Sequence, residues 1–456
     1  MTNEEQNSGI TFGQRYGYAL GEFGFTFILM FLAYYMLYFL TDIAMIPADT
    51  AALVYSICQW VEVITILIIG VVIDKVRMKR NRYSPWLIIG SAVSTVGIFI
   101  SFTKMPISNY AVYGVVFIIS YTLCYTGYNA MWIGYRSLLG VLGKSSDDRL
   151  RLATATAQMS TFSALLFSYL GTKILIKLID VKNIYGLFSL ALGVIMILCM
   201  FIVKKIVNPY DKPLELIPAE ADGEHKKNEK MSIGETVKGY LSCLTKPMVL
   251  TIFAVGFRTS ISTTISTLMI YYMTYVIGST AGLSYYMILN TAASLLATFL
   301  VPLIHKKMEK LLMWRLSAVG NIVTLLCTYF FAKTTLSFMI LLAVNQIFLS
   351  IGGSMITVFI SDVADYNDKV RHIDAHAFSF SFGALSLNLA QIIGSIVASY
   401  GLVIIGYNAA DPHPEQYADG ISFILTIATS ICVLIALIFY HFYDLTEDRM
   451  KEIEKM

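Results

Sequence analysis

Apolar segments of about 20 residues recur along this chain from one end to the other, and they constrain its fold more than any other feature. A helix needs about 20 apolar residues to cross a hydrocarbon core of about 30 Å. The chain has 456 residues and is 57% hydrophobic, so a soluble fold could not bury its apolar surface. Charged residues make up 14% of it, against roughly 25% in soluble domains. The sequence therefore predicts an all-α membrane protein.

We expect twelve transmembrane helices in two six-helix bundles. The residues before the first span lack a cleavage-site pattern, so no removable signal peptide is expected. The predicted domains are an N-terminal bundle at 1–203, a cytoplasmic linker at 204–246, and a C-terminal bundle with a cytoplasmic tail at 247–456. The predicted spans are 16–41, 48–73, 85–103, 110–138, 153–178, 183–203, 247–277, 281–304, 312–332, 335–361, 375–406 and 420–443.

The basic residues predict the orientation. Clusters of Lys and Arg follow the second, fourth, eighth and tenth predicted spans, and the linker is also rich in lysine. Loops on the other side, such as 41–50 and 406–420, are short or acidic. Because basic loops stay in the cytoplasm, we expect both termini there, in a multi-pass protein of the inner (plasma) membrane.

The two halves of the chain repeat the same pattern of charged loops. The second span of each half ends in a basic turn, at 74–82 and 305–310. The fourth span of each half ends in a loop of acids followed by bases, at 147–151 and 362–371. A parallel repeat of two six-helix bundles is the arrangement of the major facilitator fold, whose central cavity opens alternately to either side.

Motifs along nearly the whole chain resemble those of one transporter family. They are Gly21-Glu22-Phe23, Glu62 with Asp74, Tyr83-Ser84-Pro85-Trp86, Asp148-Arg149-Leu150-Arg151 and Asp362-Val363-Ala364-Asp365-Tyr366. By their order and spacing, the chain is similar to the glycoside-pentoside-hexuronide:cation symporters, the melibiose permease-like family. The resemblance implies a secondary active transporter of a glycoside, oligosaccharide or related sugar, working by alternating access.

The second span bears on the coupling ion. Glu62 lies twelve residues before Asp74, or about 18 Å along a helix, near the bilayer midplane. The family has two carboxylates one turn apart in this span, whereas this chain has Ile66 at the second position. Sodium needs several hard oxygen ligands, but one carboxylate can bind a proton, because burial raises its pKa. We therefore expect proton coupling through Glu62 rather than sodium coupling.

Arg258 lies about twelve residues into the seventh predicted span. A charge at such a depth costs about 2.5–3.5 kcal/mol on insertion scales and needs a partner or water. Our hypothesis is that Arg258 pairs with Glu62 or Glu22, and that protonation of the acid releases the pair and changes which side is open. The alternative is a permanently ion-paired structural charge.

The solute site is predicted from the resemblance and from one helix face. Glu22 matches the family acid that bonds sugar hydroxyls; a solvated gate residue is the alternative. Four aromatic residues at steps of four, three and four share a helix face suited to a sugar ring, although such a stripe also serves helix packing. The predicted solute residues are Glu22, Tyr121, Tyr125, Tyr128, Asn129, Trp132, Arg258 and Thr259.

The loops that carry both acids and bases are predicted by the resemblance to form a cytoplasmic gate. The alternative is that these charges set topology and contact lipid headgroups. The predicted gate residues are Asp74, Arg77, Asp148, Arg149, Asp362 and Asp365.

The sequence contains no recognisable nucleotide-binding loop, metal-ligand cluster or nucleophile triad, so we expect no enzyme activity, no cofactor and no metal. The expected partners are a small-molecule sugar, a coupling cation (proton or sodium) and membrane lipid, with no nucleic acid; the expected state is a monomer. The family's sugar-binding arginine and second acid are missing, which leaves a less polar solute such as a lysolipid as an alternative. A non-transporting receptor or scaffold is a further alternative, which the cost of unused buried charges disfavours.

Overall fold

The computed structural model describes residues 10–76, 81–143, 145–178, 181–211, 244–332, 334–371, 376–411 and 414–454. Within these ranges, twelve helices are long and apolar enough to cross a membrane, which confirms the predicted all-α membrane fold. The chain divides into two compact units. Unit 1 holds the described residues up to Asp211 together with Asn408–Ala410, and unit 2 holds the others.

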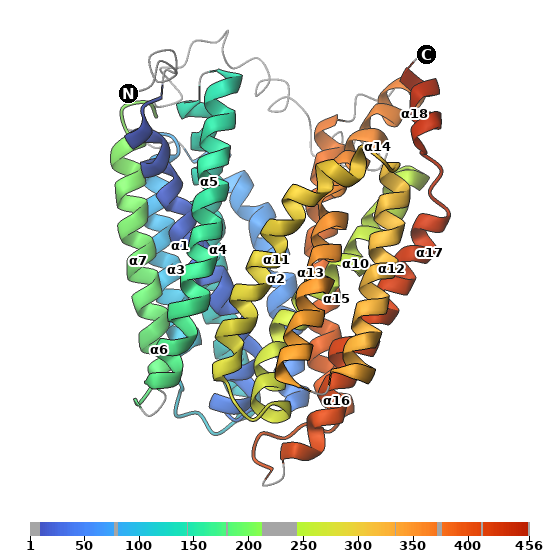
Figure 1. Ribbon diagram of the computed structural model, residues 1–456. Coiled ribbons are helices and arrows are strands. Elements are labelled where there is room, and N and C mark those ends of the chain that lie inside the picture. Colours follow the sequence, from blue (N-terminus) through green and yellow to red (C-terminus); the bar gives the residue numbers. More distant parts are fainter. Residues whose placement is uncertain are drawn as a thin grey trace. The chain divides into compact units, whose positions relative to one another are not determined.

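Unit 1 contains the first six spans (Figure 1). Its helices begin at clear signals: Thr11 and Ser145 cap α1 and α5 through capping boxes, and Pro85 lies in the first turn of α3. The elements are α1 (Phe12–Tyr38) with its π-helical extension η1 (Phe39–Ile43), α2 (Ala48–Lys75), α3 (Ser84–Ser101), α4 (Tyr110–Leu142), α5 (Ser146–Leu166) continued by η2 (Phe167–Gly171) and α6 (Thr172–Lys177), and α7 (Ile184–Val207).

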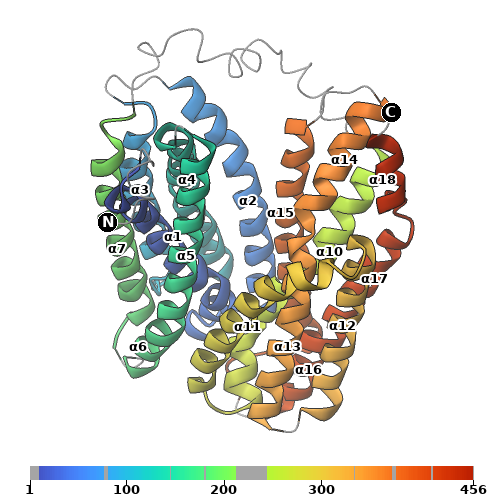
Figure 2. The ribbon, with the colours of Figure 1, turned by 45° about the horizontal axis from the view of Figure 1, so that its top comes forward.

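Unit 2 contains the other six spans and a short C-terminal helix, α18, which lies beside α14 in both ribbon views (Figures 1 and 2). Its tenth span consists of α13 followed directly by α14. The elements are α10 (Lys246–Tyr271) with η4 (Tyr272–Val276), α11 (Ala281–His305), α12 (Lys310–Phe331), α13 (Thr335–Ser354), α14 (Ile356–Arg371), α15 (His376–Ile404), η5 (Pro414–Tyr417), α16 (Ala418–Phe423), η6 (Ile424–Ala428), α17 (Thr429–His441) and α18 (Glu447–Glu454).

The two units use the same scheme of helix packing. In unit 1, α1 packs against α5 and α7, α3 packs against α4 and α7, and α2 packs against α4. In unit 2, α10 packs against α15 and α17, α12 packs against α13 and α17, and α11 packs against α13. Each pair in unit 1 thus has its counterpart at the matching spans of unit 2, as the predicted internal repeat requires.

Small residues bring α3 and α4 into close contact. A Cβ atom on Gly97 would lie 2.3 Å from the backbone nitrogen of Cys124, and one on Gly127 would lie 2.4 Å from that of Ser94. Such contacts let transmembrane helices approach to backbone distance. They hold α4, which carries most of the predicted solute residues, firmly against α3.

Asp211 joins the end of unit 1 to the start of α3. Its carboxylate accepts hydrogen bonds from the backbone N–H groups of Arg82, Tyr83 and Ser84, and its own carbonyl accepts one from Asn81. The helix before it, α7, continues to Val207, so it runs into the segment that the sequence assigned to the linker. We call the end of each unit that carries residues 81–84 or 305–310 its basic end.

Candidate functional site

Two tyrosines fix α1 against α4 beside Glu22. The rings of Tyr18 and Tyr135 stack with centroids 4.5 Å apart. Each hydroxyl donates to the other residue's backbone carbonyl, at 2.7 Å from Tyr18 and 3.1 Å from Tyr135. Gly21 makes room for this contact, because a Cβ atom there would lie 2.3 Å from the Tyr135 ring. The position of Glu22 relative to α4 is therefore rigidly set.

Glu22 pairs with Arg136 of α4. The distance from Arg136 Nη2 to Glu22 Oε1 is 3.0 Å, and the side chains are 46% and 6% exposed respectively. The guanidinium also lies over the Trp132 ring, 4.2 Å from its centroid. Arg136 is absent from the predicted site, although it stands four residues beyond Trp132 and so continues the spacing of the aromatic face. This spacing could have identified Arg136 from the sequence.

The predicted aromatic face of α4 is a continuous row. The Tyr121 and Tyr125 ring centroids are 4.7 Å apart, those of Tyr125 and Tyr128 are 5.7 Å apart, and Tyr128 is nearly parallel to Trp132 at 6.3 Å. Phe25 of α1 meets Trp132 edge-on at 4.7 Å. The three tyrosines are buried whereas Trp132 is half-buried. The tyrosines therefore serve largely as helix packing, and the accessible ring is Trp132.

Glu62 of α2 lies next to this row of aromatic side chains. The Tyr125 side chain lies close to the Glu62 carboxylate, and its ring contacts that of Tyr121. Asn129 donates to the Thr65 hydroxyl at 3.0 Å, and that hydroxyl donates to the Glu62 carbonyl at 3.0 Å. The predicted residues Glu62, Tyr125 and Asn129 are thus brought together, and Asn129 acts through Thr65 on the backbone of α2.

Arg258 is 2% exposed in unit 2 and surrounded by neutral groups. Its Nη2 atom donates to Ser317 Oγ at 2.9 Å and to Asn321 Oδ1 at 3.0 Å. The Phe348 carbonyl accepts from the same nitrogen at 2.8 Å, and the Trp314 ring lies 4.7 Å away.

Within unit 2, the partners of Arg258 lie on α12 and α13. Neutral oxygens and an aromatic face satisfy this guanidinium without a carboxylate. The predicted pairing with Glu62 or Glu22, which belong to unit 1, stays a prediction. Thr259, the next predicted residue, is half-buried on α10.

The predicted gate residues Asp148 and Arg149 lie in the first turn of α5 rather than in a loop. Asp148 forms a capping box with Ser145, whose hydroxyl accepts from the Asp148 N–H at 3.0 Å. Arg149 Nε donates to the Gly143 carbonyl at 2.9 Å. Both side chains therefore shape the turn between α4 and α5. The Asp74 side chain and the whole of Arg77 lie outside the described residues.

Asp362 and Asp365 also lie on a helix, α14, which continues beyond the predicted end of its span. Asp362 pairs with Lys310 at the start of α12, with Nζ to Oδ2 at 2.5 Å. The Lys310 backbone N–H donates to Glu447 of α18 at 3.0 Å. The basic turn after α11, the acid of α14 and the C-terminal helix are thus joined at the basic end of unit 2.

The family of this chain follows from comparison with known proteins. A family model described as MFS/sugar transport protein matches residues 17–447. The chain belongs to this family. It is similar to the uncharacterized symporter YjmB of Bacillus subtilis (strain 168), at 26% identity over 99% of this chain and 96% of that one. A glucuronide carrier protein homolog of Escherichia coli (strain K12) is 22% identical over 96% of this chain and 93% of its own length.

A solved structure shows the same fold. The inward-open xylose transporter XylE from E. coli aligns with a TM-score of 0.63 at 14% identity, covering 97% of this chain and 99% of XylE. The predicted symporter family and the major facilitator fold are therefore confirmed. This member of the MFS/sugar transport protein family is a multi-pass membrane transporter of the sugar symporter type.

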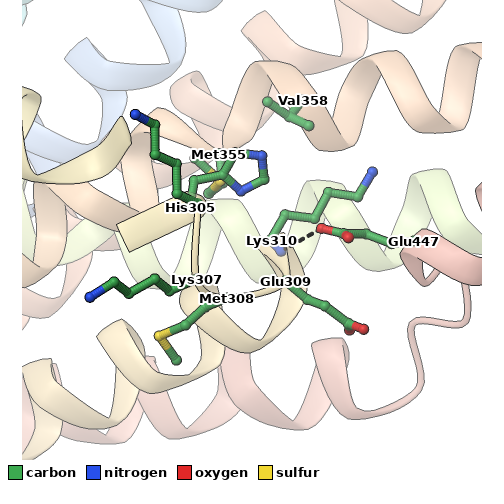
Figure 3. Close-up of a pocket in the computed structure, with 9 residues that line it drawn as sticks. His305, Lys307, Met308, Glu309, Lys310, Met355, Val358 and Glu447 are labelled. Carbon is green, nitrogen blue, oxygen red and sulfur yellow. Dashed lines mark hydrogen bonds between the residues drawn. The ribbon is translucent and has the colours of Figure 1, made fainter. Parts of the chain in front are cut away.

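A cavity of about 560 Å³ opens at the basic end of unit 2 in this sugar transporter, and Figure 3 shows its lining. The turn from His305 to Lys310 forms one wall, while Met355, Val358 and Glu447 form the others. Both lysines and glutamates line it, and Lys310 is already bound to Asp362. The cavity contains none of the predicted solute residues, so the candidate solute site remains the group around Glu22, Arg136 and Trp132.

Proposed function

We propose that this transporter is a proton-coupled symporter that imports a glycoside, oligosaccharide or related sugar by alternating access. The observation that carries the proposal is the group of Glu22, Arg136 and Trp132, which combines an ion pair and an indole ring inside the spans of unit 1. A half-exposed charge inside a span needs water around it, and a polar solute needs the same environment. In our proposal the Glu22 carboxylate accepts sugar hydroxyls while Trp132 supports the sugar ring.

Glu62 is the proposed proton carrier. Its carboxylate lies close to Tyr125, where α2 packs against α4. An ionised carboxylate only accepts hydrogen bonds, whereas a protonated one can also donate. Loss or gain of a proton at Glu62 therefore changes the bonding between these helices, which supports a link between protonation and the conformation of unit 1.

We propose different roles for the predicted gate residues. Asp148, Arg149 and Asp362 organise the basic ends of their own units through the contacts described above. Asp74, Arg77 and Asp365 are retained as gate residues on the basis of the family resemblance. The basic loops support an orientation in the inner membrane with both termini in the cytoplasm.

Uptake into proteoliposomes tests the proposal. The purified protein is given labelled mono-, di- and trisaccharides, uronides and lysolipid, with an inward proton gradient, with a sodium gradient, or with neither. We expect a sugar to accumulate when the proton gradient is present, and we expect the sodium gradient to have no effect on its accumulation. Glu62→Gln is expected to abolish accumulation but to retain exchange of labelled for unlabelled sugar, since exchange does not require net proton movement.

A matched control is Asp49→Asn, which removes an exposed carboxylate from the first turn of the same helix and is expected to leave accumulation unchanged. Transport of lysolipid but of none of the sugars would show that the proposed solute class is wrong. Unchanged accumulation in Glu62→Gln would show that the coupling residue is wrong.

A further inference from the structure

The cavity at the basic end of unit 2 is lined by charges of both signs, and some of them are already bound within the protein. Lys310 pairs with Asp362, and Glu447 accepts the hydrogen bond of the Lys310 backbone N–H. Figure 3 shows that the side chains of Lys307 and Glu309 leave the turn in opposite directions. The cavity therefore has a basic side at Lys307 and an acidic side at Glu309.

Lys306 and Lys307 provide the positive charge of the basic side. Both side chains are exposed, and among the described residues neither amino group takes part in an ion pair. An ammonium group has three N–H donors and no acceptor. Its hydrogen bonds are strongest when the acceptor is an anion, such as a phosphate oxygen. These two lysines are therefore suited to bind a phosphate group.

An apolar face of α11 leads to the same two lysines. Leu296, Phe299 and Leu303 are each more than half exposed, and their spacing of three and four residues puts them on one side of the helix. Lys306 and Lys307 stand three and four residues after Leu303, so they continue that side. Lys306 also keeps a helical backbone, with φ −61° and ψ −19°. One side of α11 is therefore apolar along its length and basic at its end.

The position of the cavity favours a membrane lipid as the source of the phosphate. The cavity lies at the turn between α11 and α12, which are both long and apolar enough to cross a membrane. The ends of such helices lie at the headgroup region of the bilayer. The volume of about 560 Å³ falls within the range of about 300–1,000 Å³ that is typical of small-molecule sites. A headgroup fits this space while an acyl chain follows the apolar side of α11.

We propose that this cavity binds the headgroup of an anionic phospholipid. The phosphate lies at Lys306 and Lys307, and Met355 and Val358 provide an apolar wall for the glycerol part of the lipid. Basic pockets between transmembrane helices are suited to anionic headgroups. The inference concerns a lipid partner and does not depend on which solute the protein transports.

The net charge of the headgroup is expected to set the selectivity of the site. Phosphatidylglycerol has a single charge, on its phosphate, whereas phosphatidylethanolamine and phosphatidylcholine also carry a cation, which the lysines repel. A lysine near an anionic headgroup strengthens binding about fivefold. The two lysines together are therefore expected to favour phosphatidylglycerol by roughly 5- to 25-fold.

Lipid titrations test this proposal. The purified full-length protein in detergent is titrated separately with dioleoyl phosphatidylglycerol, phosphatidylethanolamine and phosphatidylcholine, and native mass spectrometry gives the Kd of the first bound lipid. We expect the Kd of phosphatidylglycerol to be roughly 5- to 25-fold lower than that of phosphatidylcholine. The double variant Lys306→Gln with Lys307→Gln is expected to raise the Kd of phosphatidylglycerol by the same factor and to leave that of phosphatidylcholine unchanged.

The matched control is the double variant Lys204→Gln with Lys205→Gln. These adjacent lysines lie in the last turn of α7, after the exposed residues Leu198 and Phe201, but they do not line the cavity. Their loss is expected to leave the Kd of phosphatidylglycerol unchanged. Thermal melting of each variant reports whether it folds. If the double variant in the cavity does not fold, the single variant Lys306→Gln and the lipid preference of the parent protein still decide the matter.

Competition with soluble anions distinguishes a lipid from a free phosphate. We expect neither inorganic phosphate nor glycerol 1-phosphate to displace phosphatidylglycerol at an equal concentration, because neither contacts the apolar side of α11. Displacement by either anion would overturn the lipid as the occupant. Equal or tighter binding of phosphatidylcholine or phosphatidylethanolamine would overturn the selectivity for an anionic headgroup. An equal rise in Kd in the control variant would overturn the cavity as the site.

Discussion

Replacement of Gly352 by alanine tests the account of Arg258 as a structural charge. A Cβ atom at this position would lie 1.8 Å from Arg258 Nη1 and 2.1 Å from Cζ. The guanidinium would have to move, and with it the bonds to Ser317 and Asn321. Overpacking of a core costs about 1–3 kcal/mol, and a hydrogen bond to a charged group contributes about 1.5–3 kcal/mol. We therefore expect Gly352→Ala to lower the free energy of unfolding by about 3–5 kcal/mol.

The adjacent residue provides a matched control. Gly353 lies in the same last turn of α13, and a Cβ atom there would have no neighbour within 4 Å. Because both substitutions change helix propensity similarly, the difference between them isolates the clash with Arg258. Unfolding in detergent, followed by tryptophan fluorescence, measures it, since Trp314 lies 4.7 Å from the guanidinium. Equal stability of Gly352→Ala and Gly353→Ala would refute the structural role of Arg258.

Three further substitutions test contacts at the ends of helices and between them. Asp211→Ala removes the acceptor of three backbone N–H groups at the start of α3. We expect the free energy of unfolding to fall by about 1–2 kcal/mol. A decrease smaller than about 0.3 kcal/mol, which is within experimental error, would contradict this prediction. Tyr135→Phe deletes a buried hydroxyl bond to the Tyr18 carbonyl, with an expected loss of about 1–3 kcal/mol, and unchanged thermal unfolding would argue against it. Glu447→Gln removes the negative charge of the side chain that accepts the hydrogen bond from the Lys310 backbone N–H. Amide hydrogen exchange in α18 is therefore expected to become faster. Unchanged exchange would show that other contacts hold α18.

The amino-acid sequence determined the number and class of the spans. A segment inside the bilayer must satisfy its own backbone hydrogen bonds, so an apolar run of about 20 residues has few choices besides a helix. The row from Tyr121 to Trp132 on one face of α4 could also be predicted, because the period of a helix is local.

The tertiary structure decided which charge pairs with which. Glu22 and Arg136 are 114 positions apart, and Lys310 is bound by Asp362 and Glu447 from two other helices. Hydropathy placed Asp148 and Asp362 in loops, yet a helix can extend beyond its apolar run where caps and ion pairs satisfy its polar groups. Helix formation depends on residues within a few turns, whereas the partner of a buried charge depends on where distant helices pack, and no local pattern contains that information.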